Sequence, residues 1–298
     1  MPIRSGGFKM LKANLTFFYS MIRHGNMNTN SKFYEEGMTK EEIRKDFDRR
    51  RIVLGEEYRY SGLRVLTPIQ KARPDLTNKS YEEMKVLQEK YNSKYQDGHY
   101  IRVTNGMVEP YEDLYDLDLY ADILMMDDKV KDVALAYPVA DCPVVIAEDN
   151  YKKAVAMAHC GGEYIDRELP GQLIDSLYEE FDSKPYDISV YIGPHAQVES
   201  FTYDRYPKFI QNPKNWEGCL YERNGLIHIN MDKAIIDQLI SRGVELNTIY
   251  SSKIDTITNP DFYSNSAARF DKTKAGRFYT GCVYKDVKCL SKCLYKNK

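Results

Sequence analysis

The chain has 298 residues, in which 42 lysines and arginines face 44 aspartates and glutamates, for a formal net charge of −2. This balance argues against a dedicated nucleic-acid-binding protein, which usually carries a basic excess or a basic face. No apolar stretch approaches the roughly 20 residues that a membrane span needs, and the first ten residues lack a signal-peptide core. We therefore expect a soluble, cytoplasmic protein that binds neither membranes nor nucleic acid.

The first third of the chain is rich in charged and polar residues. Helical spacing with a charged face predicts a helix over 40–53, and an apolar run predicts a strand over 63–69. The mostly polar segment 74–97 follows, with one further helix predicted over 81–92. A polar segment of this kind between two strands is typical of an insertion rather than of a core element.

The middle and the end of the chain carry the expected core. Short apolar runs bounded by turn residues predict buried strands, at 100–104, 133–140, 144–147, 154–158 and 188–192. A polar turn over 148–151 separates two of them, and helices are predicted over 169–181 and 231–242, the second ending at Gly243. Strands and helices that do not alternate strictly favour an α+β fold.

A cysteine and a histidine lie at the ends of two of these neighbouring strands. Cys142 comes just before the strand at 144–147, and His159 closes the strand at 154–158. A thiol and an imidazole delivered by adjacent strand ends, beside the small residues Gly161 and Gly162, suit metal ligation or nucleophilic catalysis. We therefore expect Cys142 and His159 to form a functional pair.

Several short motifs in this order resemble the laccase-domain proteins, a family associated with purine nucleoside phosphorylase and adenosine deaminase activities. The motifs are Ala-Asp-Ile-Leu at 121–124, Ala-Asp-Cys-Pro-Val at 140–144, Ala-His-Cys-Gly at 158–161, Gly-Pro-His-Ala at 193–196, Phe-Tyr-Ser at 262–264 and Gly-Arg at 276–277. The resemblance implies a single-domain layered sandwich of mixed sheets flanked by helices. It would span 10–285, with the insertion at 74–97 and a short tail at 286–298.

The resemblance also implies a zinc ion held by one cysteine and two histidines. Cys142 and His159 match two of these ligands, whereas Ala72 stands where the family has its remaining histidine. Either His195 or His99 could replace that ligand, or the site could hold no metal. Copper fits less well, because the five histidines lack the paired spacing of multicopper sites.

Other residues match positions near the family's pocket. Arg23, Gln70 and Arg277 are candidates for binding substrate. Glu163 stands where the family has an arginine. It could act as a general base, although a carboxylate there would repel a phosphate substrate.

Three functions remain open at this point. The resemblance implies a divergent zinc enzyme that acts on a purine nucleoside, by phosphorolysis or by deamination. A metal-free hydrolase with Cys142 as nucleophile and His159 as base is an alternative. A third possibility is a member without catalysis that binds a nucleoside or a protein. The oligomeric state is left open.

Overall fold

The structure, a computed structural model, describes residues 15–24, 26–27, 39, 42, 45–46, 49–50, 64–68, 100–110, 114 and 121–284. The predicted helix 81–92, the insertion 74–97 and the tail 286–298 lie outside the described residues. Of the predicted helix 40–53, the structure describes residues 42, 45, 46, 49 and 50, which are helical. The domain bounds 10–285 stay a prediction.

The largest sheet has six strands, which are β3 (Tyr100–Arg102), β4 (Ile123–Asp127), β6 (Val144–Asp149), β7 (Ala154–His159), β8 (Ile188–Ile192) and β12 (Ile249–Ser251). Their order across the sheet is β12-β8-β6-β7-β4-β3. β6 pairs antiparallel with both β7 and β8, whereas β3 with β4 and β8 with β12 are parallel pairs. The sheet is therefore mixed, and β6 lies inside it with neighbours on both sides.

Two further sheets complete the described strands. One contains β1 (Leu15–Tyr19), β2 (Arg64–Leu66), β5 (Val133–Val139) and β13 (Phe278–Tyr284), in the order β1-β13-β5-β2. The other contains β9 (Thr202–Tyr203), β10 (Leu220–Arg223) and β11 (Leu226–Ile229), in the order β10-β11-β9. Because β1 pairs with β13, segments from the two ends of the sequence lie side by side.

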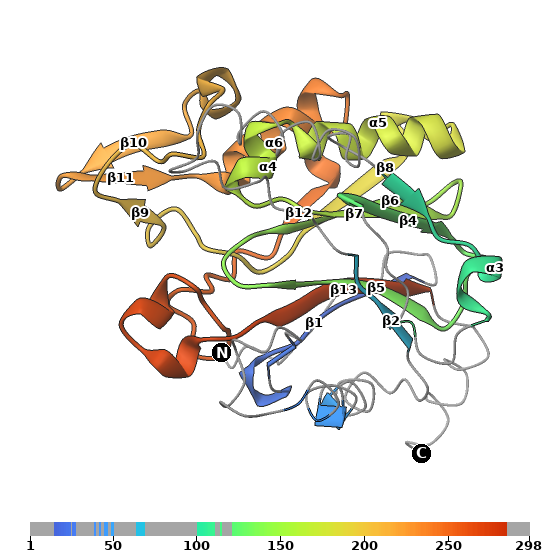
Figure 1. The fold of residues 1–298 in the computed structure, drawn as a ribbon. Helices are drawn as coiled ribbons and strands as arrows, with labels where there is room; N and C mark the ends of the chain where they lie inside the picture. The colour runs from blue at the N-terminus through green and yellow to red at the C-terminus, as the bar shows by residue number, and fades with distance from the viewer. Residues whose placement is uncertain are drawn as a thin grey trace, which may run out of the picture.

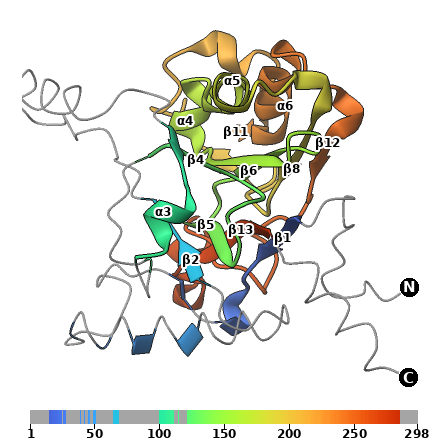
Figure 2. The ribbon, with the colours of Figure 1, turned by 90° about the vertical axis from the view of Figure 1, so that its right-hand side faces the viewer.

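The helices cover one face of the six-stranded sheet. They are α4 (Gly162–Asp166), α5 (Leu169–Phe181) and α6 (Met231–Ser241), while α3 (Asn105–Val108) lies near β2 and β3. In Figure 2 the helices form the upper layer, the six-stranded sheet the middle layer and the four-stranded sheet the lower layer. The protein is thus a layered α+β sandwich.

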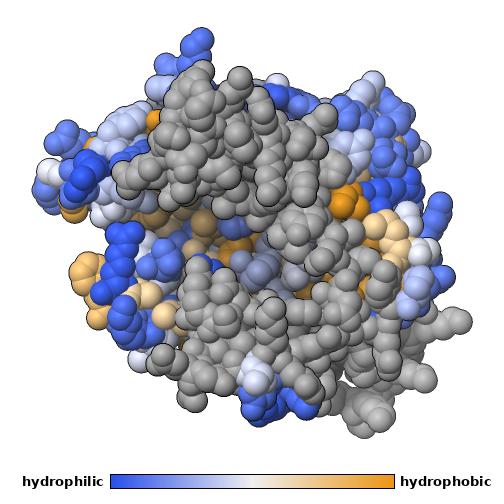
Figure 3. All heavy atoms as spheres, in the orientation of Figure 1, coloured by the Kyte–Doolittle hydropathy of each residue, from blue (hydrophilic) through white to orange (hydrophobic). Residues whose placement is uncertain are grey.

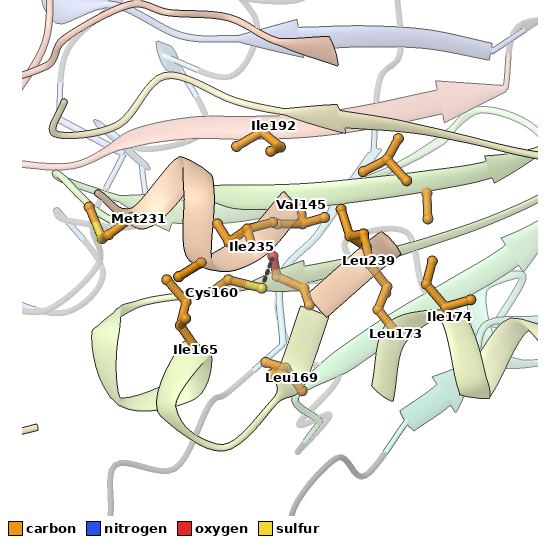
Figure 4. Close-up of a cluster of buried hydrophobic side chains, with 14 of the residues drawn as sticks. Val145, Cys160, Ile165, Leu169, Leu173, Ile174, Ile192, Met231, Ile235 and Leu239 are labelled. Atoms are coloured by element: carbon orange, nitrogen blue, oxygen red, sulfur yellow. Dashed lines mark hydrogen bonds between the residues drawn. The ribbon is translucent and has the colours of Figure 1, made fainter. Parts of the chain in front are cut away.

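Alternation along the central strands produces two cores. On β6, Val145 and Ala147 face the helices, whereas Val144 and Ile146 face the four-stranded sheet, and all four are fully buried. Figure 4 shows the helix-side core, where side chains of α5 and α6 meet those of β6 and β8. Cys160 belongs to this core, and its thiol lies 3.8 Å from the carbonyl of Ala158. Cys160 is therefore a packing residue.

The predicted α+β sandwich is confirmed, and most predicted elements form within two residues of their expected ends. The helix predicted over 169–181 has those bounds, and the one predicted over 231–242 ends one residue earlier. One prediction was wrong, because Glu148 and Asp149 continue strand β6 instead of opening a turn. They pair with β7 on one side and β8 on the other, so two acidic residues lie within the sheet. No helix of the described residues has the length and hydropathy to cross a bilayer.

Candidate active site

Strand pairing brings Cys142 and His159 to one place. His159 lies opposite Val144 in the β6–β7 ladder, and the amide of Cys160 donates a hydrogen bond of 2.8 Å to the carbonyl of Pro143. A Cβ atom built on Gly161 would lie 3.1 Å from Cys142 Sγ and 3.7 Å from His159 Nε2. Both side chains therefore border the small space that the missing side chain of Gly161 leaves open.

Asp141 fixes the backbone that presents Cys142. Its φ of 74° lies in the left-handed region, which aspartate tolerates better than most residues. One carboxylate oxygen accepts a 2.8 Å hydrogen bond from the Thr256 hydroxyl, and the other accepts a 2.7 Å bond from the Ser266 amide. The Asp141 carbonyl accepts a third bond, from the amide of Ala196. Asp141 thus fastens the Cys142 turn to three distant segments.

Burial keeps both groups of the pair uncharged. It raises the pKa of the Cys142 thiol to about 12, an effect that Asp141 strengthens and Arg277 opposes. Burial also lowers the pKa of the His159 imidazole to about 4, and the positive charge of Arg277 lowers it further. At neutral pH the pair is a thiol beside a neutral imidazole.

Arg277 is close enough to Cys142 and His159 for its positive charge to affect both of their pKa values. It precedes β13, its backbone exchanges hydrogen bonds with Asn26 and Met27, and its side chain is partly buried. Burial lowers the pKa of the guanidinium, while Cys142 and Asp141 act in the opposite direction. The expectation from the sequence that Arg277 binds substrate stays a prediction.

Comparison with known proteins identifies the family. A family model described as multi-copper polyphenol oxidoreductase laccase matches residues 96–285. The chain belongs to this laccase family. The purine nucleoside phosphorylase CA_C1699 of Clostridium acetobutylicum is 27% identical over 150 residues, which are 49% of this chain and 60% of that relative. The match thus covers less than two thirds of the relative's length.

Three solved structures share the laccase-family fold. Bacillus licheniformis hypothetical protein YfiH has a TM-score of 0.65 at 19% identity, covering 91% of this chain and 93% of that one. YlmD from Geobacillus stearothermophilus has a TM-score of 0.67 at 18% identity, covering 92% and 93%. Neisseria meningitidis protein NMB0706 has a TM-score of 0.60 at 16% identity, covering 92% and 96%.

His195 has other partners than the cysteine and histidine of the laccase-family motif. Its Nδ1 atom lies 2.8 Å from the carbonyl of Gly193, and its Nε2 atom lies 2.9 Å from the amide of Gln197 and 3.5 Å from Asp232. Among the described residues no three histidine, cysteine or acidic side chains are grouped to hold a metal ion. The structure therefore does not place His195 beside Cys142 and His159 as a third ligand. His99 and Gln70 lie outside the described residues.

Glu163 forms an ion pair with Arg167. It lies in the first turn of α4, and its carboxylate is 2.6 Å from the guanidinium of Arg167 one turn later. Arg167 partly offsets the charge of this carboxylate. The general-base role expected for Glu163 stays a prediction. Arg23, another candidate from the sequence, is an exposed residue of the short 3-10 helix Ile22–His24.

Aromatic residues that the sequence analysis did not single out enclose the site. The rings of Tyr137 and Tyr164 each lie 6.1 Å from the His159 ring. Phe209 covers Gly162 so closely that a Cβ atom there would be 2.6 Å from its ring. Tyr164 could have been suspected from its place five residues after His159. Phe209 could not, because its segment is distant in sequence and matches none of the motifs.

Proposed function

We propose that this chain is a cytoplasmic purine nucleoside phosphorylase whose site is built on Cys142, His159 and Arg277. The observation that carries the proposal is the meeting of a cysteine–histidine pair with a partly buried arginine at one strand end. The partial match to a relative named purine nucleoside phosphorylase supports the same substrate class. Phosphorolysis needs a cation for the phosphate, and Arg277 supplies one.

In this reaction Arg277 binds the phosphate, and His159 orients the reactants. Arg277 binds the phosphate by charge-assisted hydrogen bonds and turns an oxygen toward the anomeric carbon of the ribose. A C–O bond to phosphate forms as the glycosidic C–N bond breaks, and the bonding electron pair leaves with the base. His159, uncharged at neutral pH, orients the phosphate or the ribose by accepting a hydrogen bond.

We further propose that the site can hold a zinc ion. Cys142 and His159 are ligand types that zinc prefers, but a catalytic zinc site normally has three protein ligands, and the described residues supply two. With the matching position taken by Ala72, and with His195 bonded to other groups, we propose His99 as the third donor. When bound at such a site, zinc would act as a Lewis acid toward an oxygen of the substrate.

The alternatives are supported less well. A thiol hydrolase needs a thiolate, yet burial keeps Cys142 protonated, and a histidine with a pKa of about 4 is a weak base for it. Deamination would use the same site with water attacking C6 of adenosine. A nucleoside-binding protein without catalysis would keep the pocket and have no use for a phosphate-binding cation such as Arg277.

The test is turnover of inosine and adenosine with and without phosphate, followed by chromatography of the products. We expect ribose 1-phosphate and free base only when phosphate is present, and loss of both in Cys142→Ala and His159→Ala. Arg277→Gln should raise the KM for phosphate more than the KM for nucleoside. Inosine formed from adenosine without phosphate would establish the deaminase instead, and nucleoside binding without turnover would establish the binding protein.

Metal content tests zinc independently of activity. Elemental analysis of protein purified without an affinity tag should find zinc near one per chain, lost in Cys142→Ala, His159→Ala and His99→Ala but kept in His195→Ala. Zinc lost in His195→Ala and kept in His99→Ala would reverse the choice of third ligand. Absence of zinc in the parent protein would remove the metal from the proposal.

A further inference from the structure

The loop that follows strand β8 carries a buried histidine close to the Cys142 turn. In this loop, which spans 193–197, the amide of Ala196 donates a 2.9 Å hydrogen bond to the carbonyl of Asp141. His195 directly precedes Ala196, and its side chain is 1% exposed. The conformation of this loop therefore affects the residue that precedes Cys142.

The imidazole of His195 joins both ends of this loop. Its Nδ1 atom lies 2.8 Å from the carbonyl of Gly193, and its Nε2 atom lies 2.9 Å from the side-chain amide nitrogen of Gln197. A carbonyl oxygen only accepts and an amide nitrogen only donates, so both contacts are hydrogen bonds when Nδ1 carries the hydrogen and Nε2 a lone pair. The neutral ring thus braces the loop from two residues before His195 to two residues after it.

The carboxylate of Asp232, in the first turn of α6, agrees with a neutral ring. Its Oδ2 atom accepts hydrogen bonds from Lys253 at 2.7 Å and from the hydroxyl of Ser251 at 3.1 Å. Its buried Oδ1 atom lies 3.5 Å from His195 Nε2 and has no hydrogen-bond donor among the described residues. Burial lowers the pKa of His195, as does Lys253, and this outweighs the opposite effects of Asp232, the Gly193 carbonyl and Asp255.

The main chain of His195 connects this loop to a second one. Its amide donates a 3.2 Å hydrogen bond to the carbonyl of Ile254, and its carbonyl accepts one of 3.2 Å from the amide of Thr256. These bonds form a parallel bridge between His195 and Asp255. The hydroxyl of Thr256 donates to a carboxylate oxygen of Asp141. Two of the three segments that fasten Asp141 therefore meet at His195.

We propose that His195 is a positioning residue, whose neutral imidazole holds the Cys142 turn in place by bracing the loop after β8. The inference concerns the candidate site and holds whichever reaction the site performs. Without the ring the loop would open more often, and the hydrogen bond between Ala196 and Asp141 would open with it. Cys142 would then follow a turn with one attachment fewer.

Exchange of the Ala196 amide hydrogen in deuterated water, followed by NMR, measures how often its hydrogen bond opens. We expect this exchange to be about tenfold faster in His195→Ala, because both ring contacts are lost. His195→Asn keeps a donor at the position of Nδ1 for the Gly193 carbonyl, so it should recover part of the protection. The amide of Cys160, bonded to Pro143 beside the β6–β7 ladder, should exchange as in the parent.

His228→Ala is the matched control. His228 is also buried, and its Nδ1 atom likewise contacts a main-chain carbonyl, that of Val198 at 3.0 Å. It lies on β11, in a hairpin with β10 that projects at the left of Figure 1 and is mainly hydrophilic in Figure 3. We expect its replacement to leave exchange at Ala196 unchanged. Gln197→Met, which removes only the contact at Nε2, replaces His195→Ala in the test if that variant does not fold.

The tautomer of His195 has its own spectroscopic signature. Nitrogen-15 NMR at neutral pH should give a pyrrole-type shift at Nδ1 and a pyridine-type shift at Nε2. The reversed pattern would overturn the inference, as would exchange in His195→Asn as fast as in His195→Ala. Unchanged exchange at Ala196 in His195→Ala and Gln197→Met, or equal acceleration by His228→Ala, would also overturn it. Absence of phosphorolysis in the parent would overturn the proposed function alone.

Discussion

The buried acidic residues at the two ends of strand β6 differ in their hydrogen bonding. At its beginning, both carboxylate oxygens of Asp141 accept hydrogen bonds, and Arg277 acts on the neighbouring thiol. At its end, Glu148 is fully buried, and neither of its carboxylate oxygens has a hydrogen-bond partner among the described residues. The carboxylate of Asp141, just before the strand, thus has hydrogen bonds to both oxygens, whereas the carboxylate of Glu148, near its end, has none among the described residues.

This difference fits a candidate site at the beginning of the strand rather than at its end. A satisfied network holds its members in one geometry, which a site for substrate requires. A buried carboxyl group without hydrogen-bond partners favours its neutral, protonated form. Burial and the adjacent Asp149 raise the pKa of Glu148 to about 7, and the hydroxyl of Tyr284 nearby also has no partner in the described residues. Three substitutions test the contrast, from the largest expected change in unfolding free energy to the smallest.

Replacing Asp141 by alanine should remove the hydrogen bonds that hold the turn before β6. The change leaves the Thr256 hydroxyl and the Ser266 amide without their acceptor, and places alanine at a φ of 74°. We expect the free energy of unfolding in urea to fall by about 3 kcal/mol or more. Asp141→Asn keeps an acceptor oxygen and tolerates that φ, so it should cost about 1 kcal/mol. Equal losses in the two variants would contradict the role given to the hydrogen bonds.

Glu148→Gln should remove a dependence of stability on pH. Because the folded pKa of about 7 lies above the ordinary 4.5, the folded chain retains a proton that the unfolded chain releases. Stability should therefore fall between about pH 4.5 and pH 7 and stay lower above it, by about 3 kcal/mol.

The glutamine variant should lack this fall, so it should exceed the parent in stability near pH 8 and match it near pH 4.5. Urea unfolding at several pH values measures the difference. Glu222→Gln, at an exposed glutamate of β10, is the control and should change neither value. A parallel pH dependence in parent and Glu148→Gln would show that other groups cause it.

Gly161→Ala should have the smallest effect on stability and a clear effect on function. The φ of −63° suits alanine, so we expect unfolding free energy to change by less than about 1 kcal/mol. The added methyl group would crowd Cys142 Sγ at 3.1 Å and His159 Nε2 at 3.7 Å. We expect kcat/KM for inosine phosphorolysis to fall at least about tenfold. Gly106→Ala, where a Cβ meets nothing within 4 Å, is the control. Unchanged kinetics would mean that substrate does not use this space.

Much of this protein could be predicted from its sequence, because local patterns carried the information. The apolar runs and turn residues placed the central strands and both long helices, and the position of Cys142 and His159 at adjoining strand ends predicted that they meet. The ordered motifs were enough to indicate the laccase family and its layered fold. These features depend on residues that are close in sequence or repeat with the period of a helix or a strand.

Only the tertiary structure decided what surrounds that pair. Asp141 accepts hydrogen bonds from Thr256 and Ser266, which lie more than 100 residues later in the chain, and Phe209 covers Gly162. None of these separations follows a period that a sequence shows. The burial that raises the pKa of Cys142 and lowers that of His159 likewise arises from packing between layers. The sequence predicted that Glu148 belongs to a polar turn, but it lies in strand β6. Pairing with strands on both sides overrides the local preference of an acidic residue. The sequence determined which groups meet, and the packing of distant segments determined their charge and their neighbours.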